Sequence, residues 1–519
     1  MSLGLTLWKQ CNSIRLGSPS FLTQLIRLMG SCLRYSLFSI LILSSPAQAD
    51  SPSQASQISS SNPLYTGLQS GLFGMEAYSS VGPFLQTGVS TALSSKASSS
   101  QLDGRLSSRS YFSTDSSKTF NSPDVWMSFL ETDLRGRNFT SAKISFNLDA
   151  TFILDVSQAN ERRFGETERL DQIRQLYLTL PLSSRLKLHF GRRLIREAGN
   201  GWVDGVDGQF ELKPKTWLLG VYGGLSPDRF DRSLTLDYQA AGTYTDYHSN
   251  GFDLSLGYNA ILFQGGLDRH FISQRTHYKL ADGLFFSDYL IADLIRGGEV
   301  TTLLSTLDYT PVSPLNLTIN FSRYSLEQYR NQAIYRNIIE PNQALILGNE
   351  VVDLVYNRIR FSASVRLFKH IYHYQMVEYK NRAQDGLDSR IYTLGLREEN
   401  LLGTQIEVDL QAQFADHFRA DTLILAATAR KNISSVLFMD ARLTQFNGRT
   451  LDQNTDRLRI FDEAQEIYLF GLSIVGRLQQ SHRLSLSYDG VYESELTDRK
   501  TDEDNVFIHT GMFKYSYLF

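Results

Sequence analysis

Cysteine is almost absent from this chain of 519 residues, and its two cysteines, Cys11 and Cys32, both lie before residue 49. A mature protein cut after Ala49 therefore has no thiol. That excludes disulfides, thiolate metal sites, cysteine nucleophiles and c-type haem attachment. An excess of charge of one sign is also lacking, since the formal net charge is -3. Nothing in this balance indicates a nucleic-acid partner.

Long apolar runs and catalytic motifs are lacking as well. After Asp50, no stretch approaches the ~20 apolar residues of a membrane helix. The sequence contains no P-loop, dinucleotide fingerprint or EF-hand loop. His370 and His373 would lie on opposite faces of a strand, which makes them a poor metal pair. We therefore expect no enzymatic activity, no bound metal and no cofactor.

The first 49 residues have the pattern of a secretory signal peptide. Arg34 precedes a short apolar run that Pro46 ends, and Ala47 and Ala49 form a small-x-small cleavage site. The apolar run is too short to span a bilayer. The segment before it is long for a signal peptide, so Met29 is an alternative start. We predict cleavage after Ala49.

Serine dominates the next segment, with 22 of the 73 residues from Asp50 to Ser122. Such a segment buries too little apolar surface to offset the entropy lost on ordering. Residues 50–123 are predicted to be either a periplasmic N-terminal tail or a plug inside a lumen, and the sequence leaves both readings open. A weak first strand is possible from Arg105 to Ser113.

From about Val125 onward, apolar and polar residues alternate with a period of two, which indicates β-strands. Leu315–Ser322 is close to ideal, with one apolar face and one small polar face. Similar segments often run nine to eleven residues, the length that a tilted membrane strand needs. The alternative is a secreted soluble β-protein, whose strands are typically shorter, at about 5–6 residues. Segment length therefore favours a membrane-spanning β-barrel.

Connector lengths support the same fold class. Tight links, as at Thr310–Pro314, are interleaved with long polar ones, and Ser273–Gly298 is one of those expected to be long. Short turns on one rim and long loops on the other are typical of up-and-down outer-membrane barrels. The prediction is an all-β, transmembrane, antiparallel β-barrel over residues 124–519, with 16–20 strands and most simply about 18.

The last residues form an aromatic stripe, Phe513, Tyr515, Tyr517 and Phe519, at alternate positions of one strand. Here the chain resembles the outer-membrane β-barrels of Gram-negative bacteria, whose terminal strand ends in Phe. The resemblance implies that the barrel-assembly machinery reads this stripe, and that the protein resides in the outer membrane.

A second resemblance covers about forty residues, Leu176–Gly208 and its flanks. There a strand ends in Gly191-Arg192, a loop follows, and Asp-Gly pairs open the next strand. This is similar to porin-like barrels of the alginate-export type. Asp-Gly pairs also favour tight turns for local reasons, so turn formation explains them equally well.

Alternation also predicts which charged side chains face the lumen. If the apolar faces point to lipid, a basic set and an acidic set point inward, and we expect them on opposed walls of a pore. The alternative is that these charges pair with one another in a wet interior. The candidate pore-lining residues are Arg185, Lys187, His189, Arg358, Arg360, Arg366, Glu407 and Asp409.

Three functions remain at this stage. The first is an outer-membrane porin-like channel for passive diffusion of small hydrophilic solutes. The second is a structural or occluded barrel without transport, and the third, less favoured, is a barrel enzyme. The expected partners are outer-membrane lipid, lipopolysaccharide and the barrel-assembly machinery, and a homo-oligomer is left open.

Overall fold

The fold was analysed in a computed structural model, and all described residues belong to one compact unit, Ser98–Phe519. The signal peptide, with Ala47 and Ala49, and residues 50–100 lie outside the described residues. The structure describes residues 101–115, 125–139, 143–155, 172–227, 233–294, 297–325, 355–383, 386–417, 420–450, 464–479, 481–495 and 506–519.

Twenty-two strands make up the described fold. They are β1 (Gln101–Asp115), β2 (Val125–Arg137), β3 (Ser145–Asp155), β4 (Gln172–Pro181), β5 (Leu186–Ile195), β6 (Gly201–Lys213), β7 (Trp217–Leu225), β8 (Tyr238–Ser249), β9 (Phe252–Phe263), β10 (Gly266–Ala281), β11 (Leu284–Asp293), β12 (Glu299–Val312), β13 (Leu315–Ser325), β14 (Val355–Arg366), β15 (Ile371–Arg382), β16 (Asp388–Glu398), β17 (Ile406–His417), β18 (Ala420–Asn432), β19 (Leu437–Thr450), β20 (Ala464–Leu478), β21 (His482–Glu495) and β22 (Val506–Leu518). One 3-10 turn, η2 (Leu401–Gly403), joins β16 to β17. Among the described residues, no helix is long and apolar enough to cross a membrane.

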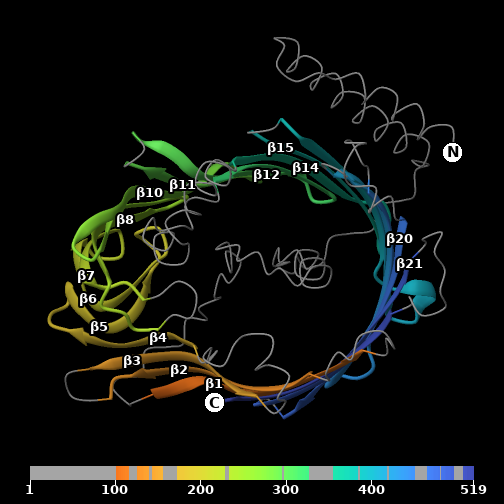
Figure 1. The fold of residues 1–519 in the computed structure, drawn as a ribbon, viewed down its shortest axis with the longest axis horizontal. Coiled ribbons are helices and arrows are strands. Elements are labelled where there is room, and N and C mark those ends of the chain that lie inside the picture. Colours follow the sequence, from red (N-terminus) through yellow and green to blue (C-terminus); the bar gives the residue numbers. More distant parts are fainter. Residues whose placement is uncertain are drawn as a thin grey trace, which may run out of the picture. The chain divides into compact units, whose positions relative to one another are not determined.

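The strands close into a ring (Figure 1). Each strand pairs antiparallel with the next, and β1 pairs with both β2 and β22. At this seam, the backbone N–H of Gly104 donates to the Phe519 carbonyl at 3.0 Å, and the Phe519 N–H donates to the Gly104 carbonyl at 3.1 Å. The prediction of an all-β antiparallel barrel is confirmed.

The strand number is 22 rather than the expected value of about 18. One reason is the hairpin of β10 and β11, which occupies most of the Ser273–Gly298 segment that we expected to be a long connector. The end of β10 is polar on both faces, so it lacks the alternation that marks a strand. A turn of two residues, Asp282 and Gly283, joins the two strands.

The barrel also begins earlier than residue 124. β1 lies within the Ser-rich segment 50–123, where alternation predicts only a weak strand. β1 carries two serines on its inner face, Ser107 and Ser113, and Ser107 pairs in register with Ser516 of β22. The hydroxyl of Ser107 donates to that of Ser516 at 2.9 Å. Serine suits a strand here because its neighbour satisfies the hydroxyl.

The two rims of the barrel differ in their connections. The ten links from even-numbered strands to the next strand have two to seven residues, from Asn250–Gly251 after β8 to 399–405 after β16. β1 starts and β22 ends on this same rim, which we call the short-turn rim. The opposite, long-loop rim carries links of up to 29 residues, the longest being 326–354. This is an up-and-down barrel.

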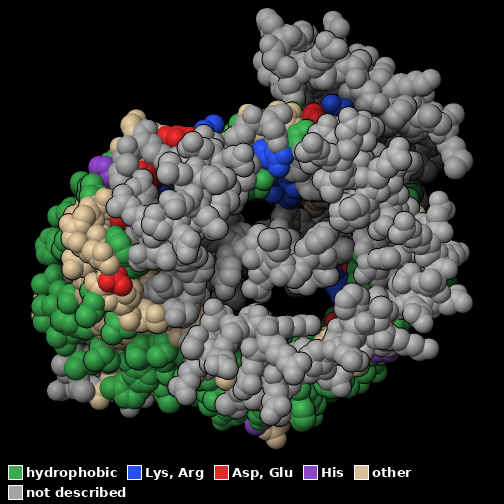
Figure 2. All heavy atoms as spheres, in the orientation of Figure 1, with side chains coloured by type: hydrophobic (Ala, Val, Ile, Leu, Met, Phe, Trp, Pro, Cys, Tyr) green, Lys and Arg blue, Asp and Glu red, His purple; other side chains and the backbone are tan. Residues whose placement is uncertain are grey.

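The wall has an apolar outer face and a polar inner face. Large apolar side chains at alternate positions are exposed on the outside, for example Leu176 and Leu178 of β4 and Phe190 of β5. Hydrophobic side chains cover the outer flank over β3 to β7 (Figure 2). Alternation therefore places polar residues of the same strands inside.

Candidate functional site: the inner wall of the barrel

The inner face of three neighbouring strands, β14, β15 and β16, is strongly basic. Cross-strand pairing puts Arg358 beside Lys380, Arg360 beside Glu378, and Tyr372 between Arg366 and Arg397. This face carries six basic residues and one acidic residue, a net charge of +5 (6 minus 1). The basic residues are Arg358, Arg360, Arg366, Lys380, Arg382 and Arg397. Lys and Arg side chains are visible on the inner edge of the wall near β14 and β15 (Figure 2).

Arg360 belongs to a buried cluster of charged side chains, together with Glu378 and Lys380. Its Nε donates to Oε2 of Glu378 at 2.5 Å, and Nζ of Lys380 lies 3.0 Å from Oε1 of the same carboxylate. The Glu378 side chain is only 1% exposed. A buried carboxylate needs paired and hydrogen-bonded partners to offset its desolvation. Arg360 and Lys380 therefore stabilise the wall, and Arg360 is less available to a solute than its position suggests.

Three other arginines of this wall form no ion pair within 4 Å among the described residues, although Arg358 lies near Glu378 and Arg397 pairs in register with Asp409. Nε of Arg358 donates to Oγ of Ser322 on β13 at 2.9 Å. Arg366 donates to the Tyr372 hydroxyl, and its guanidinium lies 4.7 Å from the centre of the Tyr372 ring. Arg397 lies 5.0 Å from the same ring. These contacts orient the guanidinium groups without neutralising them, so they can attract anions.

Glu407 and Asp409 face inward on β17, but they do not oppose the arginines of β14. β17 is three strands from β14 along the same wall, whereas we expected opposed walls. Glu407 lies 3.4 Å from Arg430, and Asp409 accepts a hydrogen bond from the Tyr374 hydroxyl at 2.7 Å. Alternation predicts the face of a residue, but it carries no information on position around the circumference.

The three candidates near β5 lie in different surroundings. Arg185 is exposed in the β4–β5 turn at the short-turn rim. Lys187 pairs with Glu211 at 2.9 Å. His189 is buried, with its ring nitrogens 2.9 Å from Oγ1 of Thr179 and 3.2 Å from the amide of Gln209. Only the first two remain accessible to solvent.

His189 belongs to a part of the wall, β5 to β11, that is packed from inside, and we call this part the packed lobe. The β5–β6 turn, residues 196–200, lies against the inner face of β9, β10 and β11. The Tyr289 hydroxyl donates to the Gly199 carbonyl at 3.3 Å. A Cβ on Gly257 would lie 2.6 Å from Cα of Ala198, so only glycine lets the turn approach this closely.

The packed lobe contains a small apolar core and a paired polar network. The core comprises Ile195, Ala198, Val203, Tyr222, Ala240 and Tyr244. Beside it, Arg193 pairs with Asp207, whose side chain is 3% exposed. The Tyr244 hydroxyl donates to Oδ1 of Asp207 at 2.8 Å, and Gln209 bonds that hydroxyl at 2.8 Å. This side of the interior is therefore filled with side chains.

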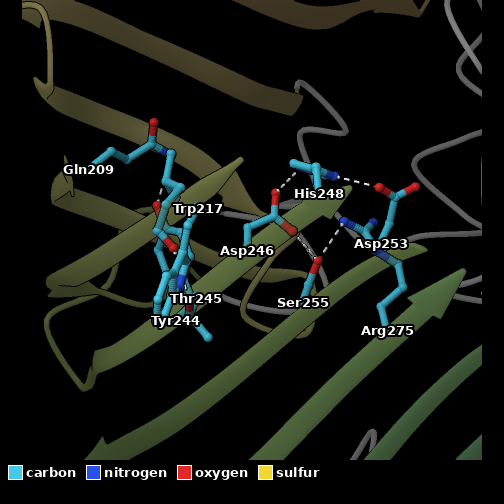
Figure 3. A network of polar contacts seen from close by, with 10 residues as sticks. Gln209, Trp217, Tyr244, Thr245, Asp246, His248, Asp253, Ser255 and Arg275 are labelled. Atoms are coloured by element: carbon cyan, nitrogen blue, oxygen red, sulfur yellow. Dashed lines mark hydrogen bonds and ion pairs between the residues drawn. The ribbon is translucent and has the colours of Figure 1, made fainter. Parts of the chain in front are cut away.

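A second polar cluster follows β8, β9 and β10 toward the short-turn rim (Figure 3). His248 lies 2.6 Å from Asp246 and 2.9 Å from Asp253. Ser255 donates to Asp246 at 2.5 Å and receives a contact from Arg275 at 3.4 Å. Both ring nitrogens of His248 face carboxylates, so the two bonds form together only in the protonated ring. The described residues contain no cluster of three or more side chains that could hold a metal ion.

Sequence reasoning did not single out Lys380, Arg397 or the Arg193–Asp207 pair. Lys380 and Glu378 alternate with apolar residues on β15, and that alternation was a usable signal. Arg193 and Asp207 meet only because β5 and β6 form a hairpin whose turn folds inward, and no local pattern marks this.

The aromatic stripe of β22 lies on the outer face. Phe513, Tyr517 and Phe519 are 43%, 37% and 37% exposed. The Tyr515 hydroxyl lies 2.7 Å from Nδ1 of His482 on β21. The role of this stripe in assembly stays a prediction.

Comparison with known proteins finds distant structural similarity and no family. No model of a protein family matches it, and no curated protein matches it. Among solved structures, it is similar to outer-membrane porins of the Occ/Opd type. Pseudomonas aeruginosa OccK3 (OpdO) is 13% identical, over 80% of this chain and 96% of that chain, with a TM-score of 0.40.

Two further structures give similar values. Acinetobacter baumannii OccAB2 is 11% identical, over 81% of this chain and 98% of that chain, with a TM-score of 0.40. Pseudomonas aeruginosa OccD3 (OpdP) is 10% identical, over 80% and 91% of the two chains, with a TM-score of 0.38. Identities this low and TM-scores below 0.5 leave the function to be argued from the chain's own residues.

Proposed function

We propose that this protein is an outer-membrane porin-like channel through which small hydrophilic solutes diffuse passively, with a preference for anions. The observation that carries the proposal is the inner face of β14 to β16, with its net charge of +5 (six basic minus one acidic residue). Charged groups on a lumen wall are the usual selectivity device of pores.

The outer face supports the membrane part of the proposal. Closed barrels span bilayers because every backbone group is paired within the wall. Here the pairing is closed at β1–β22, and the outer face is apolar. The strands, from nine to sixteen residues, are long enough to cross the hydrocarbon layer when tilted.

The size of the barrel is compatible with a channel. A circular barrel of 22 strands, spaced about 4.8 Å apart and tilted by about 40°, would be roughly 45 Å across its backbone. Wall side chains alone cannot fill such a width. The packed lobe fills one side of the interior, and the basic wall lies on strands outside this lobe.

Single-channel recording tests the proposal. Purified mature protein is added to a planar lipid bilayer, and the reversal potential is measured across a KCl gradient. Stepwise conductance with a reversal potential toward that of chloride supports an anion-preferring channel. Folded, inserted protein that gives no steps would instead indicate a structural barrel, and heat-denatured protein serves as the control.

The strand number favours a second candidate, a gated transporter. Outer-membrane transporters with 22 strands have a plugged lumen, and residues 50–100 precede β1 in the predicted mature chain. Deleting these residues separates the candidates. A large rise in conductance would mean that the segment closes the lumen, whereas an unchanged conductance would fit a tail.

The cellular setting is part of the same proposal. Export by the signal peptide predicts a mature protein that begins at Asp50 and fractionates with the outer membrane. Its partners would be outer-membrane lipid, lipopolysaccharide and the barrel-assembly machinery, with a homo-oligomer as one possible state. N-terminal sequencing of the membrane fraction tests the cleavage, and an intact Met1 or Met29 would contradict it.

A further inference from the structure

Two neighbouring turns on the short-turn rim carry basic and exposed apolar side chains together. The turns join β4 to β5 and β6 to β7, and they are adjacent because the backbone N–H of Glu211 donates to the Arg185 carbonyl at 2.8 Å. We call this surface the β4–β7 turn patch. It consists of Leu182, Arg185, Leu212, Lys213, Lys215 and Trp217.

The apolar half of the patch continues the apolar outer face of the barrel. Leu182 is 53% exposed and Trp217 is 46% exposed. Lys213 pairs in register with Trp217, so a basic residue and an exposed aromatic residue occupy paired backbone positions. The indole Nε1 donates to Oγ1 of Thr245 at 2.8 Å, so the ring has a fixed position on the outer face (Figure 3).

The basic half of the patch is only partly neutralised, because a single nearby carboxylate, that of Glu211, interacts with both Lys187 and Lys215. Arg185, Lys213 and Lys215 are exposed, and no ion pair among the described residues involves them. The neighbouring acidic residue, Glu211, already pairs with Lys187 at 2.9 Å. Three cationic groups therefore stand directly at the edge of an apolar surface.

We propose that the β4–β7 turn patch binds the head groups of anionic phospholipids in the leaflet that meets the short-turn rim. The proposal rests on the membrane placement in the proposed function. Aromatic residues of barrels lie at the level of the head groups, and Lys and Arg near a membrane surface attract anionic lipids. An acidic protein partner would use the charges, but it would leave Leu182 and Trp217 without a role.

Other exposed basic side chains lie on the same rim. They lie in or beside the turns after β2, β14 and β20. These residues are Lys143, Lys369, Arg477 and Arg483.

Native mass spectrometry of the mature protein in neutral detergent tests the proposal. The probes are phosphatidylglycerol and phosphatidylcholine with identical acyl chains. Wild-type protein is expected to retain phosphatidylglycerol preferentially. R185Q should weaken phosphatidylglycerol binding by about fivefold, since one basic residue near the surface contributes about 1 kcal/mol. The combined variant R185Q/K213Q/K215Q should lose the preference.

Strand β5 offers a matched control. Arg196 immediately follows β5 on the long-loop rim, as Arg185 immediately precedes it on the short-turn rim, and both are exposed. R196Q should leave the preference unchanged. An equal loss in R196Q, or a wild-type preference in the combined variant, would overturn the proposal. If the combined variant does not fold, R185Q against R196Q decides the question alone.

Two further readouts separate this proposal from its alternatives. Competition by soluble glycerol 3-phosphate at the same concentration would point to a free phosphate site and against a lipid site. K213Q/K215Q should conduct like the wild type in a planar bilayer. A protein that binds phosphatidylglycerol through the patch but never conducts would contradict the proposed channel function and would still support the lipid site.

Discussion

The arginines of the inner wall are of two kinds, which differ in the groups that they contact. Arg360 is held by Glu378, a carboxylate that is almost fully buried, while Arg358 and Arg366 contact only hydroxyl groups and an aromatic ring. The first kind is part of the wall's stability. The second kind keeps its charge available to the lumen, so the two kinds should respond differently to substitution.

Reversing the second kind should change ion selectivity. In R358E/R366E, two positive charges become negative, so the net charge of the inner face of β14 to β16 falls from +5 to +1 (four basic minus three acidic residues), and the anion preference should be largely lost. The reversal potential in a KCl gradient measures this change. R358Q/R366Q is the matched neutral variant and should give an intermediate value. A folded R358E/R366E variant with the wild-type reversal potential would show that these side chains do not line the conducting path.

Removing Arg360 should instead destabilise the barrel. In R360A, Glu378 keeps its ion pair with Lys380 at 3.0 Å, and breaking a buried ion pair costs about 3–5 kcal/mol. We expect a loss near the lower limit, about 3 kcal/mol, because one partner remains. Urea unfolding in lipid vesicles measures it. R358A is the control and should cost about 1 kcal/mol or less, as for a typical hydrogen bond. Equal losses in the two variants would contradict the distinction.

Single strands show how an alternating pattern becomes a two-faced wall. On β14, Ile359 shares a face with Phe361, and this face pairs with Phe321 and Ile319 of β13. Arg358 and Ser362 take the opposite face. A shift of one residue would turn every side chain of the strand to the other side, so this strand has one acceptable register.

The Ile359→Arg substitution tests that face assignment. An arginine facing lipid near the bilayer midplane costs about 2–4 kcal/mol in a barrel. The Ser362→Arg substitution, on the inner face of the same strand, should cost much less. Both are measured by urea titration of the folded protein in vesicles. Normal stability of the Ile359 variant together with loss in the Ser362 variant would mean that the faces are assigned backwards.

The last strand gives a prediction about assembly. Phe519 closes the seam through two backbone hydrogen bonds to Gly104, and its ring stacks on Tyr517 at 5.5 Å between centroids. Deleting Phe519 should lower the amount of folded protein in the outer membrane more than it lowers folding into vesicles, because a recognition signal is lost as well. Heat-modifiable mobility on gels measures both. Phe519→Tyr retains the ring and should behave almost normally.

Equal amounts of folded protein in cells with and without Phe519 would contradict a role of this residue in recognition. Equal losses in cells and in vesicles would assign the whole effect to the seam itself.

The sequence predicts which face of the wall a side chain occupies better than it predicts the number of strands or their positions around the barrel. Alternation at Leu315–Ser322 and Ile359–Arg366 reports the environment of each side chain, and β13 and β14 follow it. It misses the hairpin of β10 and β11, whose inner face belongs to the packed lobe, and it predicts only a weak strand for β1, whose Ser107 bonds across the seam. Those contacts depend on strands far apart in sequence. The same limit explains why Glu407 and Asp409 were expected opposite Arg358, Arg360 and Arg366, whereas β17 is three strands from β14.

The whole barrel combines a closed hydrogen-bonded wall with two unequal rims. Both described ends of the barrel, at Gln101 and Phe519, lie on the short-turn rim with the ten short links. The long-loop rim has links of very different lengths, and only the β5–β6 turn among the described ones packs deep inside. Because the β5–β6 turn packs against one side of the interior, the strands of the packed lobe have inner contacts that go beyond those to their neighbouring strands.

This one-sided packing has a mechanical consequence. When the chain is pulled from its C-terminus by an atomic force microscope, β22 to β12 should detach one after another, each opposed, among the described residues, mainly by its neighbouring strands. Extraction of β11 and β10 must also break the contacts of Tyr289, Ser273 and Phe271 with the β5–β6 turn. The force trace should therefore show its tallest peak at this hairpin. Tyr289→Phe, which removes the hydroxyl bond to Gly199, should lower that peak and leave the earlier ones unchanged. The β5–β6 turn would then hold five strands together against force, namely β5, β6, β9, β10 and β11.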